Sequence, residues 1–83
     1  MNTQTTPKAI VTVRYKEGVL DPQGATIQRA LSDLGMNGIQ GVRTGRTFEL
    51  SLSTGATRDL VERACRALLA NPVIESYEIE MPA

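Results

Sequence analysis

The chain has 83 residues, which is enough for one small domain whose core lies near the lower limit for independent stability. Nine Lys and Arg balance nine Asp and Glu. This balance argues against a dedicated nucleic-acid binder or a binder of acidic membranes, because such proteins carry an excess of positive charge. A chain of this size often gains stability by associating with itself or with a partner.

The sequence has no His and a single Cys, Cys65. One cysteine cannot build a disulfide framework within the chain, and it is typical of a reducing compartment. The same composition argues against a structural zinc site. The polar start lacks the apolar centre of a signal peptide, and no apolar run approaches the roughly 20 residues that cross a bilayer. We therefore expect a cytoplasmic protein.

The first seven residues are expected to form a flexible lead-in, followed by a single domain over residues 8–83. Residues 8–16 alternate, with Ala9, Val11, Val13 and Tyr15 on one side and polar residues on most of the other. This alternation predicts a strand with one buried face.

A loop over residues 18–24 leads into a predicted helix over residues 22–34. Asp21 fits the N-cap and Pro22 the first helical position. Gly35 fits the position just after the helix end. Gly24 has no local reason to lie in the first helical turn, so we expect another backbone or a partner to approach it closely. The predicted apolar stripe of this helix contains Ile27, Ala30, Leu31 and Leu34.

The next predicted unit is a β-hairpin. Residues 38–43 predict a weak strand with a bulge at Gly41, Thr44 and Gly45 a turn, and residues 47–53 a clean strand with Phe48, Leu50 and Leu52 inward.

A second helix is predicted to begin at Thr57 and to end at Asn71 and Pro72. Cys65 is expected to be a buried apolar residue on this helix. A last strand is predicted over residues 73–81, with Tyr77 and Ile79 inward. The predicted stripe of the helix contains Leu60, Val61, Ala64, Ala67 and Leu68, and the expected ion pairs are Asp59 with Arg63 and Glu62 with Arg66.

The element order β-α-β-β-α-β predicts an α+β fold of the ferredoxin-like type. In that fold a four-stranded antiparallel sheet carries two helices on one face. Ile10 and Ile74 would then point to the bare face, where we expect an oligomer interface. The alternative is that both are scattered surface apolar residues.

No catalytic constellation and no metal site are expected from the residues present. Arg43 and Arg46 flank the predicted hairpin turn and suit phosphate or carboxylate, although turn tips are commonly charged for solubility alone. The loop at residues 38–43 is similar to the phosphate loop of acylphosphatases, but it follows the first helix instead of the first strand, so we treat that likeness as coincidence. The sheet also lacks the aromatic residues of an RNA-binding RRM.

Three stretches together resemble the PurS subunit family of phosphoribosylformylglycinamidine synthase. They are residues 18–35, residues 41–50 and residues 68–79, which read GVLDPQGATIQRALSDLG, GVRTGRTFEL and LLANPVIESYEI. They cover nearly the whole chain. The second helix, which is rich in Arg, departs from the more acidic helix of the family.

The resemblance implies a small non-catalytic subunit in purine synthesis, where formylglycinamide ribonucleotide, glutamine and ATP give formylglycinamidine ribonucleotide, glutamate, ADP and phosphate. The implied partners are the chain itself, as a dimer or tetramer, and the synthetase (PurL-type) and glutaminase (PurQ-type) subunits that it bridges during ammonia transfer. ATP and Mg²⁺ would be used by the complex and not bound by this chain alone. The expected partner-binding residues are Asp21, Pro22, Gln23, Gly24, Arg43 and Arg46.

An alternative function from another class is an ACT-like domain that senses small ligands. Such domains share the predicted fold and bind ligands near a glycine-bearing loop between a strand and a helix.

Overall fold

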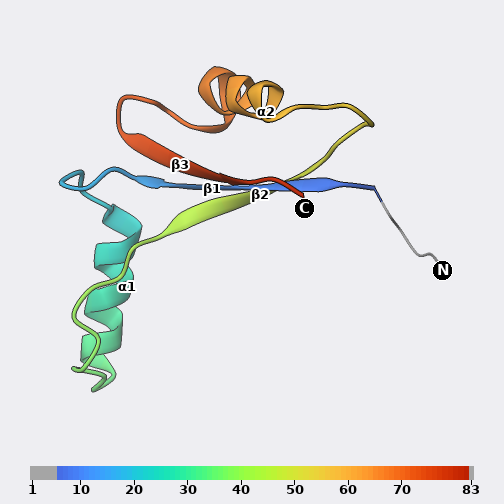
Figure 1. The fold of residues 1–83 in the computed structure, drawn as a ribbon. Helices are drawn as coiled ribbons and strands as arrows, with labels where there is room; N and C mark the ends of the chain where they lie inside the picture. The colour runs from blue at the N-terminus through green and yellow to red at the C-terminus, as the bar shows by residue number, and fades with distance from the viewer. Residues whose placement is uncertain (1–5, 83) are drawn as a thin grey trace.

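The structure is a computed structural model and describes residues 6–82. Three strands and two helices follow one another along the chain, and a five-residue π-helix continues the second helix (Figure 1). No helix among the described residues is long and apolar enough to cross a membrane. The elements are β1 (Lys8–Tyr15), α1 (Pro22–Asp33), β2 (Gly45–Ser51), α2 (Arg58–Ala64), η1 (Cys65–Leu69) and β3 (Glu75–Glu80).

The three strands form one antiparallel sheet in the order β2-β1-β3. The central strand, β1, pairs Val11 with Phe48 of β2 on one side and with Ile79 of β3 on the other. Ala9, Val11 and Val13 are fully buried, as their alternation predicted. The sheet therefore has one covered face, which these three residues share.

Helix α2 and the π-turn η1 cover that face (Figure 1). Val61 and Cys65 are buried against the strands, and the amide of Ala70 donates to the carbonyl of Cys65 at 3.0 Å, which closes the wide turn. Cys65 is thus the buried apolar residue that the sequence predicted, and burial raises the pKa of its thiol. The whole buried apolar core is small: Ala9, Val11, Val13, Val61, Cys65 and Ala70.

Helix α1 does not lie on the sheet. It projects from one end of the sheet, on the side away from α2 (Figure 1). Its predicted apolar stripe is therefore largely uncovered, with Ile27 37% and Leu34 71% exposed. The radius of gyration is 16.7 Å, whereas a compact chain of this length has about 12 Å. The expectation that both helices cover one face of the sheet was wrong.

The predicted second strand at residues 38–43 is also absent from the structure, so the sheet has three strands among the described residues and not four. This segment instead runs back along α1, where Gln28 donates from Nε2 to the carbonyl of Ile39 at 3.1 Å (Figure 1). Gly38 and Gly41 weaken any strand here, and Ile39 and Val42 have opposite parity, so no single face of a strand could be buried. The predictions of a β-hairpin and of a bulge at Gly41 were therefore wrong.

The second helix differs in its buried face. Leu60 and Leu68, which the predicted stripe placed inward, are 48% and 84% exposed. Val61, which the predicted stripe did include, is buried together with Cys65, four residues further along. The helix also ends at Leu69, two residues before Asn71. The expected pair of Glu62 and Arg66 forms at 3.5 Å, while Arg58 takes the other oxygen of Glu62 at 3.1 Å.

The last strand is shorter than predicted, whereas β1 begins at Lys8 as expected. Strand β3 begins at Glu75, so Ile74 lies in the preceding turn and not on the sheet. Of the expected lead-in, residues 1–5 lie outside the described residues. Pro7 accepts a hydrogen bond from the Leu52 amide at 2.8 Å, which places this end of the lead-in beside β2.

Candidate functional site

The N-terminus of α1 is joined to the start of β2 through one carboxylate. Asp21 caps α1 by accepting from the Gly24 amide at 2.8 Å, as predicted. It also accepts from the amide of Thr44 at 2.6 Å and from the Thr44 hydroxyl at 2.9 Å. These bonds hold the pKa of the Asp21 carboxyl below its usual value, and the bond from the Thr44 amide has the largest effect. We call Asp21, Gly24, Arg43 and Thr44 the junction cluster.

Gly24 lies where two backbones meet. It is buried, and a Cβ at this position would collide with the carbonyl oxygen of Val42 and lie 2.9 Å from the Asp21 carboxylate. The sequence predicted that another backbone approaches Gly24 closely. That backbone belongs to this chain: it is the segment of residues 36–44, which returns along α1 to the sheet. Only glycine lets α1 and that segment lie so near each other.

Arg43 ties the same segment to the central strand. Its Nη2 donates to the carbonyl of Tyr15, the last residue of β1, at 2.9 Å. An open hollow of about 340 Å³ lies beside the junction cluster, and cationic and anionic groups share its wall. The hollow is lined by Tyr15, Lys16, Glu17, Gly18, Val19, Asp21 and Arg43.

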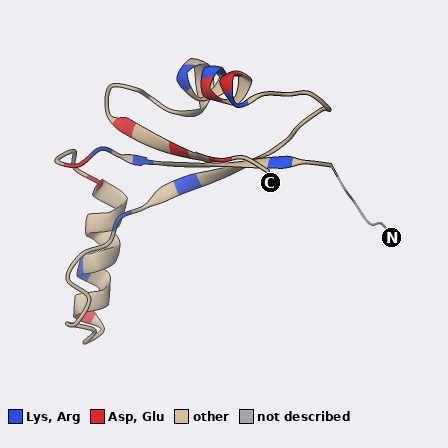
Figure 2. Ribbon diagram, viewed as in Figure 1, with Lys and Arg blue, Asp and Glu red and all other residues tan. Residues whose placement is uncertain are grey.

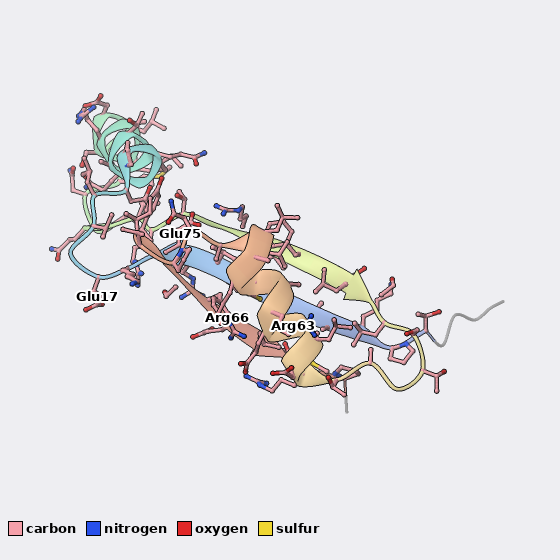
Figure 3. The ribbon with its side chains drawn as sticks, turned by 90° about the horizontal axis from the view of Figure 1, so that it is seen from above. Glu17, Arg63, Arg66 and Glu75 are labelled. Carbon is pink, nitrogen blue, oxygen red and sulfur yellow. The ribbon has the colours of Figure 1, made fainter. Side chains whose placement is uncertain are left out.

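Arg46 belongs to a second polar cluster, on the covered face of the sheet. It reaches from β2 to Glu75 of β3 and binds both carboxylate oxygens, at 2.8 and 2.9 Å. Its guanidinium also donates to the carbonyl of Leu69 at 3.0 Å, at the end of η1. Glu75 accepts a further bond from the amide of Asn71 at 2.7 Å. Figure 3 shows Glu75 at the end of the sheet that lies nearer α1.

The Arg46–Glu75 pair therefore fastens the end of η1 to the outer two strands. The hydrogen bonds from Arg46 lower the pKa of Glu75 most, and the bond from the Asn71 amide lowers it further. Glu75 in turn raises the pKa of Arg46. Glu75 is buried while half of the Arg46 side chain is exposed. The chemistry of this pair is structural: it satisfies a buried carboxylate and the last carbonyl of a helix.

The structure brings together most of the expected partner-binding residues. Asp21, Gly24 and Arg43 meet in the junction cluster, and Pro22 opens α1 next to them. Gln23 lines a hollow of about 200 Å³ that also contains Thr44, Arg46 and Glu75, so it links the two clusters.

The two isoleucines of the expected oligomer interface are far apart. Ile10 lies on the uncovered face, paired with Glu80. The carbonyl of Ile74 accepts from the amide of Lys16, beyond the opposite end of β1. The sheet therefore does not unite them into one apolar patch.

Thr44 and Glu75 are the members of these two clusters that the sequence did not single out. Glu75 shares the parity of Tyr77 and Ile79, so the alternation already placed its carboxylate on the inward face. An acidic residue at an inward position requires a partner, and that was the available signal. Thr44 carried no comparable signal, because its bond to Asp21 depends on the path of residues 36–44.

The described residues include no group of three potential metal ligands among His, Cys, Asp and Glu. Positions with charged residues of both signs lie on the sheet and on α2 (Figure 2). The arrangement can hold two arms of the chain at a fixed angle and present their surfaces. It assembles no nucleophile and base from the residues described above.

Comparisons with known proteins agree with this description. The family model of PurS, phosphoribosylformylglycinamidine (FGAM) synthase, matches residues 8–83. The phosphoribosylformylglycinamidine synthase subunit PurS of Methanocaldococcus jannaschii is 43% identical over 77 residues, which is 89% of this chain and 93% of that protein. The corresponding subunit of Bacillus subtilis is 46% identical over 77 residues, 89% of this chain and 90% of that protein.

Solved structures are similar as well. The PurS structure of B. subtilis in a C2 crystal form superposes with a TM-score of 0.85 at 43% identity, covering 93% of this chain and 99% of that one. The structure of PurLQS from Thermotoga maritima contains a chain that superposes with a TM-score of 0.81 at 31% identity, covering 94% of this chain and 99% of that one. The chain therefore belongs to the PurS family of FGAM synthase subunits, and it is an accessory subunit of an enzyme complex in purine biosynthesis.

Proposed function

We propose that this chain works as an oligomeric scaffold in FGAM synthase, associating first with a second copy of itself and then with the synthetase and glutaminase subunits. The single observation that carries the proposal is the position of α1, which projects from the sheet with Leu34 71% and Ile27 37% exposed. An apolar helix stripe that its own chain leaves uncovered is buried by association.

The small core supports the same conclusion. Six buried apolar residues form it, and none of them belongs to α1. A chain of this kind completes its burial in an oligomer, where folding and assembly are coupled. We assign the self-contact surface to the apolar stripe of α1 and to the uncovered sheet face that contains Ile10. We assign Ile74, which is exposed in the turn before β3, to a separate contact of the oligomer.

The junction cluster fixes the angle between α1 and the sheet, and with it the geometry of the scaffold. Asp21, Gly24 and Thr44 hold the two backbones together. Pro22 and Gln23 are exposed at this corner. We propose that the corner, with Arg43 and the exposed part of Arg46, is a contact for the larger subunits.

In this function the chain holds the two larger subunits in a fixed relative position, so that ammonia released from glutamine reaches the synthetase. ATP and Mg²⁺ act in the complex, and the chain contributes no ligand to them. It works in the cytoplasm, a compartment that keeps the buried Cys65 thiol reduced. The match of the PurS model to residues 8–83 leaves the ACT-like sensing domain without support.

Co-purification tests the proposal. With glutamine present, the chain should co-elute with the synthetase and glutaminase subunits. Adding it should also increase formation of formylglycinamidine ribonucleotide from glutamine much more than formation from ammonium salt. Failure to co-elute, or an equal effect on both nitrogen sources, would contradict the scaffold function.

A further inference from the structure

Asn37 and Gly38 lie side by side in the turn that follows α1. Both are exposed, and the amide of Ile39 closes the turn by donating to the carbonyl of Met36 at 3.3 Å. Figure 1 shows this turn at the end of α1 that lies away from the sheet. In an asparagine–glycine pair, the glycine has no Cβ to keep its backbone nitrogen away from the asparagine side chain. The turn therefore places an amide carbon and a backbone nucleophile next to each other.

No hydrogen bond restrains either reacting group among residues 6–82. The amide of Gly38 donates to no other residue there, and the side chain of Asn37 has no hydrogen-bond partner. A Cβ built on Gly38 would meet no atom within 4 Å, so the peptide group between the two residues has room to turn. The Gly38 nitrogen can thus approach the Cγ carbon of Asn37 without displacing a packed side chain.

The other asparagine of the described residues lacks this combination. Asn71 precedes Pro72, whose nitrogen carries no hydrogen and cannot attack the side chain. The Oδ1 of Asn71 also accepts from the amide of Val73 at 3.0 Å, which holds that side chain in place. Of the two asparagines in the range 6–82, only Asn37 has both the required neighbour and the freedom to react.

We infer that Asn37 is a self-modification site, at which the side chain deamidates through a succinimide ring. The Gly38 backbone nitrogen loses its proton and forms a bond to Cγ of Asn37. The bond from Cγ to Nδ2 breaks, and the NH₂ group leaves with that proton as ammonia. Water then opens the ring at one of its two carbonyl carbons, which gives aspartate or isoaspartate at position 37. The reaction consumes one water molecule and needs no oxidant or cofactor.

The product changes the surface at the end of α1. Either form places a carboxylate between Met36, which is 49% exposed, and Ile39, which is 40% exposed. The isoaspartate form also adds a CH₂ group to the main chain of the turn. The inference is independent of the proposed scaffold function, because the reaction needs only the turn itself.

The full-length chain, incubated at mildly alkaline pH and then digested with trypsin, tests the inference by mass spectrometry. The peptide of residues 30–43 should gain, at position 37, the mass that replaces NH₂ by OH. The peptide of residues 67–83, which contains Asn71, should stay unchanged and is the internal control. A sample digested without incubation gives the background. Incubation at mildly acidic pH should slow the reaction, because the attacking nitrogen must lose its proton.

Gly38→Ala is the matched variant. Its methyl group has open space, so the variant should keep the unfolding temperature of the wild type. Deamidation of Asn37 should nevertheless become about tenfold or more slower, because a Cβ hinders the attacking nitrogen.

Two results would overturn the inference. One is a folded chain in which position 37 stays at the background level, and the same chain unfolded in guanidinium chloride then shows whether the fold is what blocks the reaction. The other is a Gly38→Ala variant that deamidates at the wild-type rate, because the Gly38 nitrogen would then not be the attacking group.

Discussion

Asp21 and Thr44 lie 23 positions apart in the chain, yet the amide of Thr44 donates to the Asp21 carboxylate at 2.6 Å. The same carboxylate caps α1 through the Gly24 amide. One side chain therefore starts a helix and fixes the place where the chain returns to the sheet. Because α1 has no other extensive support, this relationship determines where its apolar stripe points.

Replacing Asp21 should loosen the junction. In Asp21→Asn one carboxylate oxygen becomes an NH₂ donor, so the side chain keeps one acceptor for the Gly24 amide but loses the bond from the Thr44 amide, and the link between α1 and β2 weakens. We expect a lower unfolding temperature at fixed protein concentration. Glu17→Gln, a neighbouring exposed position, is the control and should unfold like the wild type. Equal unfolding temperatures for all three proteins would show that the bonds from Thr44 to Asp21 do not hold the junction.

Stability should fall in acid for a defined reason. The pKa values of Asp21 and Glu75 are lowered in the folded chain from the ordinary values of 3.8 and 4.5. A lowered pKa means that the unfolded chain binds the proton more readily, so these groups stabilise the fold above the ordinary values and the stabilisation disappears as the pH falls through the folded values. The free energy of unfolding should decrease from about pH 5 downward. In the double variant Asp21→Asn, Glu75→Gln this decrease should be shallower, and an unchanged slope would assign it to other groups.

Gly24 and Gly38 offer a matched pair of substitutions. In Gly24→Ala the new methyl group would collide with the Val42 carbonyl, so the backbones must separate. We expect a lower unfolding temperature and a loss of assembly, because the angle of α1 changes. Gly38 has open space around a new Cβ, and Gly38→Ala should leave stability within about 0.5 kcal/mol of the wild type. If the two variants behave alike, the close approach at Gly24 has no energetic consequence.

The Arg46–Glu75 pair should contribute more than an exposed ion pair. In Arg46→Ala the buried Glu75 carboxylate loses both guanidinium bonds, and we expect a destabilisation of about 1–3 kcal/mol in chemical denaturation. Arg46→Lys keeps the charge but not the two parallel bonds. Its free energy of unfolding should therefore lie between that of the wild type and that of Arg46→Ala. Lys8→Ala removes the exposed pair with Glu49 and should cost at most about 1 kcal/mol. A cost for Arg46→Ala no greater than that for Lys8→Ala would contradict this ranking.

The sequence predicted well where a local rule decides the structure. Alternation placed Ala9, Val11 and Val13 in the core, and Asp21 and Thr57 cap their helices through the first-turn amides as expected. Gly35 ends α1 with a φ of 89°. Each of these features depends on residues within a few positions.

Prediction from the sequence failed where the structure depends on contacts between residues that are far apart in the chain. Helical periodicity shows that the face of α1 with Ile27 and Leu34 is apolar, but it cannot show that this chain leaves the face uncovered. The segment at residues 38–43 has strand-forming residues. It lies along α1 instead, because Asp21 binds the adjacent Thr44 and Gly24 allows the Val42 carbonyl to approach closely. The π-turn at Cys65 likewise has no periodic signature, and it reversed the exposure of Leu68.

The oligomeric mass of the isolated chain tests the central claim most directly. Multi-angle light scattering after gel filtration should give at least twice the 9.0 kDa mass of one chain. Ile27→Glu, which places a charge in the uncovered stripe of α1, should shift the protein toward a single chain or toward unfolding. A stable, folded wild-type monomer of 9.0 kDa would contradict the account, because the stripe of α1 would then need no partner.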